Sequence, residues 1–350
     1  MKKNILVVDD SALMRRVICD IINTDDTFQA TDVCRDGLEA YERIKSVKYD
    51  AIVLDVNMPR MDGLQLLEKL QQEGVKATII MVSTLTAKDT RTTVIAMELG
   101  AVDFVTKPTN IIEAKGEDFK NRLLSVLKAV LISDQIKRVS VTRPVRTPIP
   151  TIIRKGSNKN KLVALACSTG GPKALQSVIP YLEANLDAPM VLVQHMPMGF
   201  TKSMADRLNE LSKIRVKEAE DNEVLMKGTV YVAPGGKHLK VARTKDGHKI
   251  VLGNEPAVGG LKPCADIMYE SLKSCAFDEI TCVVLTGMGA DGTKGIGSLK
   301  QKVPIHVISQ DAASCVVYGM PKAVYEAGYV NEVVPLDAVA QSIMKNVGVK

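Results

Sequence analysis

The feature that most constrains the fold of this chain is the alternation of short, wholly apolar runs with helix-length amphipathic stretches. Runs of four or five residues without polar alternation are typical of strands buried on both faces of a parallel sheet. The expected strands are Ile5–Val8, Ala51–Leu54, Thr78–Val82, Val102–Val105, Leu162–Ala166, Met190–Val193, Val230–Ala233, Thr281–Leu285 and Ile305–Ile308. The pattern predicts an α/β protein with two doubly wound parallel-sheet domains.

A segment with the composition of a linker separates the two groups of strands. Between Ile136 and Lys161 there is no acidic residue, and prolines and a Gly-Ser-Asn triplet interrupt any apolar period. Its basic residues are Lys137, Arg138, Arg143, Arg146, Arg154, Lys155, Lys159 and Lys161. We therefore expect a first domain over residues 1–125, a helical end and basic linker over 126–161, and a second domain over 162–350. In the second domain, a turn around Asp246-Gly247 predicts a β-hairpin.

Charge and hydropathy exclude several classes of protein. The net charge of +6 comes from the linker segment, because outside it 38 basic residues face 40 acidic ones. We therefore expect no nucleic-acid partner. No apolar run approaches the roughly 18 residues of a membrane helix, and the amino end lacks a signal-peptide core. Seven cysteines without a C-x-x-C pair indicate neither zinc binding nor redox chemistry. We expect a cytoplasmic protein without an integral membrane segment.

Acidic and polar residues directly follow the expected strands of the first domain. Asp9 and Asp10 follow the first strand, Asp55 the second, Ser83 the third, and Lys107 the fourth. Ligands of open α/β sheets collect at the carboxyl ends of the strands. Three carboxylates suit Mg²⁺, and a lysine beside them can neutralise a phosphoryl group, so Asp55 is the expected phosphoryl acceptor. Taken singly, each acidic residue could instead cap a helix or begin a turn.

Together these residues carry a resemblance to the response-regulator receiver domain. The matching segments are Ile5–Ser11, Leu54–Gly63, Met81–Ser83 and Asp103–Pro108. The resemblance implies a flavodoxin-like fold and Mg²⁺-dependent phosphorylation of Asp55 by a histidine kinase, with Asp9 and Asp10 as further metal ligands. It also implies that Ser83, Phe104 and Lys107 are the positions that respond to the phosphoryl group.

A serine, a histidine and an aspartate follow three expected strands of the second domain. Ser168 lies in a Gly-rich strand-to-helix turn, His195 ends the next strand, and Asp291 lies in the turn after Thr281–Leu285. These residue types can act as nucleophile, general base and orienting carboxylate. Their order along the chain is Ser, His, Asp, whereas α/β-hydrolases have the order Ser, Asp/Glu, His, which indicates an independent arrangement.

Other interpretations of these residues remain open from the sequence itself. The Ser168 turn could cradle a phosphate at a helix N-terminus, and His195 could be a structural hydrogen-bonding residue. Gly287-x-Gly289-x-x-Gly292 with Asp311 imitates the fingerprint of an NAD-binding enzyme, although Asp291 would then face a pyrophosphate. A receiver-controlled adaptor without enzymatic activity is the third alternative.

The second domain resembles the protein-glutamate methylesterases of bacterial chemotaxis. The matching segments are Ala166–Pro172, Gln194–Thr201, Tyr231–Leu239, Leu285–Gly292 and Tyr318–Val324. The resemblance implies a Rossmann-like esterase domain with Ser168, His195 and Asp291 as catalytic triad and no cofactor in the esterase site. It further implies hydrolysis of glutamate methyl esters on methyl-accepting chemoreceptors, deamidation of receptor glutamines, and inhibition by the receiver until Asp55 is phosphorylated.

Neighbouring residues supply further expectations. The backbone amides of Thr169 and Met288 are expected to bind the oxyanion of the reaction. We expect the Met288 side chain to face the core, and Cys167 to point back into the sheet rather than act as a nucleophile. Cys167 and the stretch Gly259–Pro263 depart from the family's pattern, which could affect thiol sensitivity and receptor preference.

Overall fold

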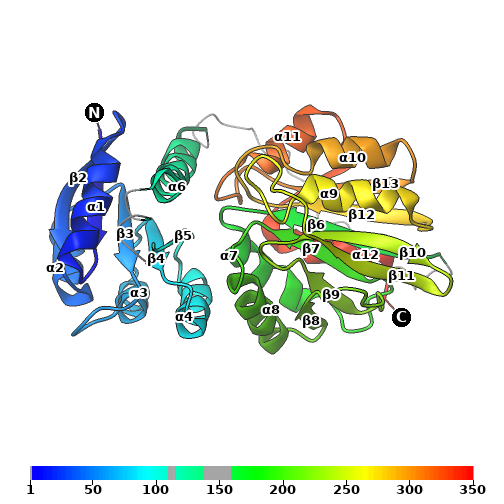
Figure 1. Cartoon of the computed structure of the whole chain (residues 1–350), viewed down its shortest axis with the longest axis horizontal. Coiled ribbons are helices and arrows are strands. Elements are labelled where there is room, and N and C mark those ends of the chain that lie inside the picture. Colours follow the sequence, from blue (N-terminus) through cyan, green and yellow to red (C-terminus); the bar gives the residue numbers. More distant parts are fainter. Residues whose placement is uncertain (1, 109–112, 114–115, 137–158, 350) are drawn as a thin grey trace. The chain divides into compact units, whose positions relative to one another are not determined.

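The computed structural model describes residues 2–108, 113, 116–136 and 159–349 of the chain. It divides into two compact units, Met1–Ile136 and Lys137–Lys350, which are described separately (Figure 1). Each unit contains a parallel sheet flanked by helices, which confirms the predicted fold class. Residues 137–158, which include most of the expected linker, lie outside the described residues.

The first unit is built on a five-stranded parallel sheet in the order β2-β1-β3-β4-β5. Its strands are β1 (Lys3–Val8), β2 (Phe28–Cys34), β3 (Ala51–Asp55), β4 (Ile79–Ser83) and β5 (Asp103–Thr106). This order is flavodoxin-like, as predicted. The strand order reverses between β1 and β3, so the carboxyl ends of these two strands border the crevice where ligands bind in such sheets.

Helices cover both faces of this sheet. They are α1 (Ala12–Asn23), α2 (Gly37–Ser46), α3 (Gly63–Gln72), α4 (Ala87–Glu98) and α6 (Glu117–Ile136). Side chains fix their starts: the Ser11 hydroxyl accepts a hydrogen bond from the Met14 amide, and Asp62 forms a reciprocal capping box with Gln65. Leu123 and Leu127 of α6 are fully buried in the core of this unit. Because α6 keeps packing into this core beyond residue 125, the whole helix belongs to the first compact unit.

The second unit contains a seven-stranded parallel sheet in the order β14-β13-β12-β6-β7-β9-β8. Its strands are β6 (Lys161–Cys167), β7 (Met190–Gln194), β8 (Arg215–Glu218), β9 (Thr229–Val232), β12 (Glu279–Val284), β13 (Ile305–Gln310) and β14 (Glu332–Val334). The strand order reverses at β6, which lies between β7 and β12. The crevice of this sheet is therefore expected at the carboxyl ends of those three strands.

The predicted hairpin is confirmed as the antiparallel pair β10 (His238–Thr244) and β11 (Gly247–Gly253). The helices of this unit are α7 (Gly171–Gln176), α8 (Phe200–Leu211), α9 (Ala265–Ser271), α10 (Thr293–Lys300), α11 (Met320–Glu326) and α12 (Val339–Val347), with 3₁₀ turns at Ile179–Tyr181, Leu272–Ser274 and Leu336–Ala338. Figure 1 shows α9 and α10 side by side. Tyr269 of α9, Ile296 of α10 and Val241 of the hairpin share one core with the sheet. None of the described helices is long and apolar enough to cross a lipid bilayer.

Three strands were not anticipated from the sequence, and all three lie at sheet edges. They are β2, β8 and β14. In β2, Phe28 and Cys34 are buried, whereas the five residues between them are half-buried or exposed. An edge strand pairs on one side only and need not be covered on both faces, so it lacks the continuous apolar run by which a central strand is recognised.

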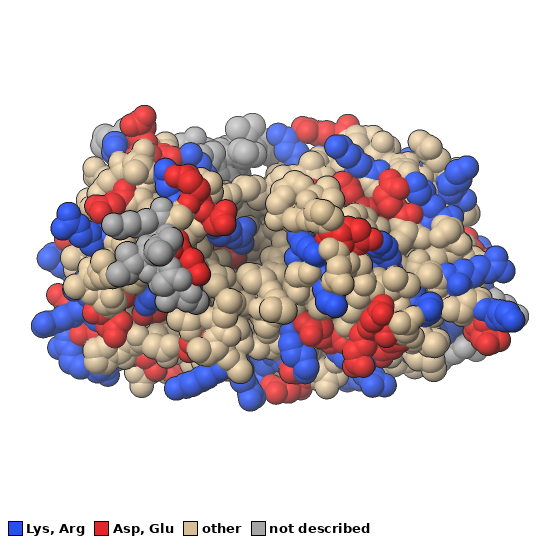
Figure 2. Space-filling model, viewed as in Figure 1, with Lys and Arg blue, Asp and Glu red and all other residues tan. Residues whose placement is uncertain are grey.

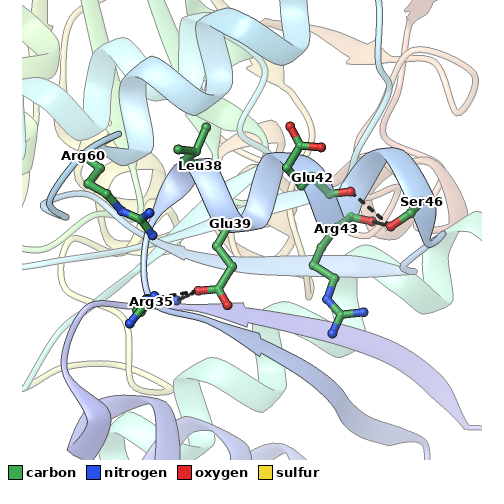
Figure 3. Close-up of a pocket in the computed structure, with 7 residues that line it drawn as sticks. All are labelled: Arg35, Leu38, Glu39, Glu42, Arg43, Ser46 and Arg60. Atoms are coloured by element: carbon green, nitrogen blue, oxygen red, sulfur yellow. Dashed lines mark hydrogen bonds and ion pairs between the residues drawn. The ribbon is translucent and has the colours of Figure 1, made fainter.

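A shallow pocket of about 430 Å³ lies over α2 (Figure 3). The three arginines that line it are each ion-paired: Arg35 with Glu39, Arg43 with Asp32, and Arg60 with Asp36. These pairs tie α2 to its neighbouring strand β2 and to the loop after β3. Away from this pocket the surface charge is mixed. Figure 2 shows Lys and Arg interspersed with Asp and Glu on the visible face of each unit.

Candidate functional sites

The acidic residues predicted for the first unit come together at the carboxyl ends of β1 and β3. Asp9 follows β1 and Asp55 is the last residue of β3, and both are buried. One carboxylate oxygen from each of Asp9, Asp10 and Asp55 lies within 4.8 Å of the other two. Lys107 Nζ lies 2.9 Å from Asp9 Oδ2 and 2.8 Å from Asp55 Oδ2. The structure therefore brings together all four predicted residues of this cluster.

The electrostatics of this cluster leave it short of positive charge. Burial and the neighbouring charge of Asp9 raise the pKa of Asp55 to about 6, and Lys107 only partly opposes them. Burial likewise raises the pKa of Asp9. Burial alone would lower the pKa of Lys107, but the two carboxylates outweigh it and raise that pKa. An oxygen-only donor set with one cation among three carboxylates is chemically suited to a hard divalent ion.

The surroundings of Asp55 depend on close backbone packing. A Cβ at Gly63 would lie 2.3 Å from the Asp55 carbonyl oxygen, so only glycine lets α3 begin here. Asp55 of β3 pairs with Val82 of β4 in the parallel register, and Ser83 is the next residue and the last of β4. The Ser83 hydroxyl oxygen accepts a hydrogen bond of 2.7 Å from the Thr93 hydroxyl. Phe104 is buried on β5. Ser83 and Phe104, to which the resemblance assigns a response to the phosphoryl group, thus lie on β4 and β5, which follow β3 in the sheet order.

The backbone pairing of β6 and β7 brings Ser168 and His195 to neighbouring strand ends. Cys167 pairs with Gln194 in the parallel register, and the His195 amide donates to the Cys167 carbonyl at 3.2 Å. Asp291 lies in the turn between β12 and α10, on the other side of β6. The three predicted residues therefore lie at the carboxyl ends of β6, β7 and β12, where the strand order reverses.

His195 and Asp291 form the central contact of this second site. His195 Nε2 lies 2.7 Å from Asp291 Oδ2, and both side chains are buried. Oδ2 also accepts the Ala265 amide at 2.6 Å, while Oδ1 accepts the Asp266 amide at 2.9 Å and the Cys264 thiol at 3.1 Å. The amino end of α9 thus cradles the Asp291 carboxylate.

These contacts keep Asp291 ionised. Burial alone would raise its pKa, but the hydrogen bond and charge of His195 and the two α9 amides hold it at about 2. The Nε2–H of His195 can then donate a hydrogen bond to the Asp291 carboxylate, which leaves Nδ1 as the acceptor nitrogen of the neutral ring. Sequence reasoning missed the amides of Ala265 and Asp266, because main-chain donors leave no residue-type signal.

The Ser168 turn is held between β7 and β12. The Ser168 amide donates to the Thr286 carbonyl at 3.0 Å, and the Thr286 hydroxyl donates to the Thr169 carbonyl at 2.9 Å. A Cβ at Gly287 would lie 2.8 Å from Ser168 Cβ, so the turn that carries Met288 packs directly against the serine. The two amides predicted to bind an oxyanion therefore belong to adjoining turns.

Two side chains near the site can be compared with their predictions. Cys167 is fully buried, its thiol donates to Gln194 Oε1 at 3.0 Å, and burial raises its pKa. It therefore points into the sheet as expected, out of reach of solvent. The prediction for Met288 is wrong: the residue is 45% exposed and does not face the core.

The sequence of this chain matches known proteins over nearly its whole length. Residues 5–115 match the family described as response regulator receiver domain, and residues 163–343 match CheB methylesterase. The chain is 41% identical over 349 residues to protein-glutamate methylesterase/protein-glutamine glutaminase 1 of Syntrophomonas wolfei, covering 98% of this chain and 99% of the relative. The Bacillus subtilis protein-glutamate methylesterase/protein-glutamine glutaminase is also 41% identical, with 97% of each chain covered.

A solved structure agrees with this assignment. The crystal structure of the Thermotoga maritima CheB methylesterase catalytic domain is 40% identical and matches with a TM-score of 0.52, over 54% of this chain and 99% of that one. The competing dinucleotide interpretation fails, because Asp291 inside the Gly287–Gly292 turn is engaged by His195 and α9. This chain therefore belongs to the CheB methylesterase family and carries a response regulator receiver domain at its amino-terminal end.

Proposed function

We propose that this chain is a phosphorylation-activated serine hydrolase that removes methyl groups from glutamate methyl esters of chemoreceptors and deamidates receptor glutamines, for chemotaxis adaptation. The observation that carries the proposal is the buried His195–Asp291 pair, 2.7 Å apart, beside the Ser168 turn. Relatives that match nearly the whole length of this chain are named protein-glutamate methylesterase/protein-glutamine glutaminase. We expect the reaction to take place in the cytoplasm, where a chemotaxis histidine kinase can act on the receiver.

In the first step, Ser168 Oγ attacks the γ-carbonyl carbon of the receptor glutamyl ester. His195 takes the serine proton at Nδ1, and the ionised Asp291 stabilises the resulting imidazolium through Nε2. The carbonyl oxygen becomes an oxyanion, which accepts hydrogen bonds from the Thr169 and Met288 amides. The tetrahedral intermediate then collapses, the C–O bond to the methoxy group breaks, and His195 gives its proton to the departing methanol.

In the second step, water hydrolyses the glutamyl-serine ester. His195 accepts a proton from the attacking water and returns it to Ser168 Oγ as the acyl–oxygen bond breaks, which releases the receptor carboxylate. Deamidation follows the same path with ammonia as the leaving group. No step requires a cofactor in the esterase site.

The receiver is proposed to control this reaction through Asp55. Asp9, Asp10 and Asp55 would hold Mg²⁺, which supplies charge neutralisation for phosphoryl transfer to Asp55 from the histidine kinase. Lys107 already contacts the carboxylate that would carry the phosphoryl group, at 2.8 Å. Ser83 and Phe104 would respond to that group and shift the receiver between two conformations.

The decisive test of the hydrolase is methanol release from methylated chemoreceptor membranes. Wild type should release methanol, and Ser168→Ala should lose about 10⁶-fold in turnover. Ser309→Ala is the matched control, because Ser309 is another buried serine near a strand end of the same sheet and its hydroxyl donates to the carbonyls of Gln310 and Pro321. If Ser168→Ala retained more than a few per cent of wild-type turnover, the nucleophile would be another residue.

The regulatory part is tested with a small phosphoryl donor. We expect the donor and Mg²⁺ together to raise wild-type activity, and Asp55→Asn to keep basal activity without the rise. A fragment beginning at Lys159 should exceed the activity of the unphosphorylated full chain if the receiver inhibits by covering the esterase site. Equal activity of fragment and full chain would reject coverage, and a normal response of Asp55→Asn would move the phosphorylation site elsewhere.

A further inference from the structure

The side chain of Gln194 connects the two chain segments that carry the proposed nucleophile and base. Gln194 is the last residue of β7 and is 2% exposed. Its Nε2 donates to the Ser168 carbonyl at 3.0 Å and to the His195 carbonyl at 3.3 Å, while its Oε1 accepts the Cys167 thiol at 3.0 Å. One buried amide therefore ties β6 and the serine turn to the end of β7.

The orientation of this amide is dictated by its partners. Carbonyl oxygens can only accept hydrogen bonds, so two of them must face the Nε2 end. The opposite end faces a thiol, which can donate. The reverse orientation would place Oε1 against two acceptor oxygens inside a buried pocket, at the cost of unsatisfied polar groups.

The bond to the Ser168 carbonyl also sets the direction of the next amide. The peptide unit between Ser168 and Thr169 is planar and trans, so its C=O and N–H point in opposite directions. Gln194 and the Gly171 amide, which donates to the same carbonyl at 2.7 Å, hold that C=O inward. The Thr169 N–H is therefore directed away from Gln194.

We infer that Gln194 is a positioning residue of this esterase. By fixing the Ser168–Thr169 peptide plane, Gln194 aims the Thr169 amide at the oxyanion. Its second hydrogen bond holds the main chain of His195 in register with the serine turn. The inference rests on the proposed function, since it requires Ser168 as nucleophile and Thr169 as an oxyanion donor. Gln194 touches no reacting atom and acts through the main chain alone.

Gly171 supports this role, because the Gln194 side chain occupies the space beside it. A Cβ at Gly171 would lie 1.9 Å from Gln194 Oε1 and 3.1 Å from Cys167 Sγ. Any larger residue at position 171 would push the Gln194 amide out of its hydrogen bonds. The start of α7 and the Gln194 network therefore form one packed unit.

The first test is Gln194→Met in the full-length enzyme, which preserves side-chain length but removes all three hydrogen bonds. Misdirected oxyanion donors slow the chemical step rather than substrate binding, so we expect kcat for methanol release to fall about 10²-fold while KM changes less than about twofold. Gln194→Glu, which loses both donated bonds, should be at least as slow. Tyr269→Phe is the matched control: its fully buried hydroxyl also bridges two strands, contacting the carbonyls of Ala164 and Val283 at 3.2 and 3.3 Å.

A second pair of variants displaces Gln194 without changing it. Gly171→Ala should lower kcat as Gln194→Met does, and combining the two should add little, because both remove the same interaction. Gly297→Ala in α10 is the control, since its Cβ would also meet the end of a side chain, Tyr329 Oη at 2.6 Å. Gly297→Ala should at most lower the stability of the enzyme and should not lower kcat as Gly171→Ala does.

The outcomes separate this inference from the proposed function. Activity of Ser168→Ala would reject the proposed function itself. If Ser168→Ala is inactive but Gln194→Met and Gly171→Ala both retain kcat within about threefold of wild type, the role of Gln194 is refuted. The role is also refuted if kcat falls equally in Tyr269→Phe or Gly297→Ala, because the loss would then follow stability rather than position.

Discussion

Replacing the phosphoacceptor Asp55 by asparagine should stabilise the receiver in the absence of Mg²⁺. The Asp55 side chain is almost completely buried, and burial together with the Asp9 charge raises its pKa from 3.8 to about 6. A carboxyl whose pKa is higher in the folded state binds its proton more tightly when folded. Its ionisation therefore destabilises the fold, and stability falls as the pH rises from about 4 to about 6.

The size of this effect follows from the shift. A difference of about two pKa units corresponds to roughly 3 kcal/mol at any pH above about 6. The asparagine side chain is neutral and has the same shape as the carboxyl, so Asp55→Asn should raise the free energy of unfolding by about 1 to 3 kcal/mol at about pH 7.5. The gain should shrink between about pH 6 and pH 4, where the wild-type carboxyl becomes protonated as well.

Urea unfolding of a fragment ending at Ile136 would measure this gain. Far-UV circular dichroism is the appropriate signal, because the chain contains no tryptophan. Asp89→Asn is the matched control with the opposite sign. Asp89 is equally buried, and burial alone would raise its pKa, but hydrogen bonds from Thr84 and from Asn57, the latter at 2.7 Å, lower it, so its replacement should destabilise the fold.

Magnesium provides a second condition for the same experiment. A bound ion stabilises the folded state by about 2.7 kcal/mol at a concentration of about 100 times its Kd. Wild type should therefore recover stability in Mg²⁺, and the advantage of Asp55→Asn should narrow. The reasoning is refuted if Asp55→Asn is no more stable than wild type at about pH 7.5 without Mg²⁺, or if its gain persists unchanged at about pH 4.

Further predictions concern the triad carboxylate and a helix cap. Asp291→Asn should lower kcat for methanol release about 10⁴-fold by favouring the wrong tautomer of His195, and a loss under about tenfold would contradict its orienting role. Because the pKa of Asp291 is about 2 when folded, its contribution of about 2 kcal/mol is present above about pH 4 and is lost as the pH falls toward 2. Asp291→Asn should remove this loss of stability at low pH, measured as the free energy of unfolding in urea titrations of the esterase fragment. Asp36→Ala removes a carboxylate that accepts the amides of Leu38 and Glu39 at 3.0 Å each, and should cost the receiver about 1 to 2 kcal/mol in the same unfolding assay.

The central strands and the polar residues that follow them could be predicted from the sequence. A strand buried on both faces requires an unbroken apolar run, so Asp9, Asp55, Ser168 and His195 could be placed at strand ends. The resemblance to known families then suggested their roles. The edge strands β2, β8 and β14 escaped prediction, because partial exposure removes the apolar run that marks a central strand.

Which side chains meet was decided only by the tertiary structure. Asp291 is held by main-chain amides of α9, and the serine turn is held by Gln194 from a neighbouring strand. Neither contact follows from periodicity, which reports how deeply a residue is buried but not what lies opposite it. Those partners depend on strand order and register, which are set by the packing of the whole sheet and its helices.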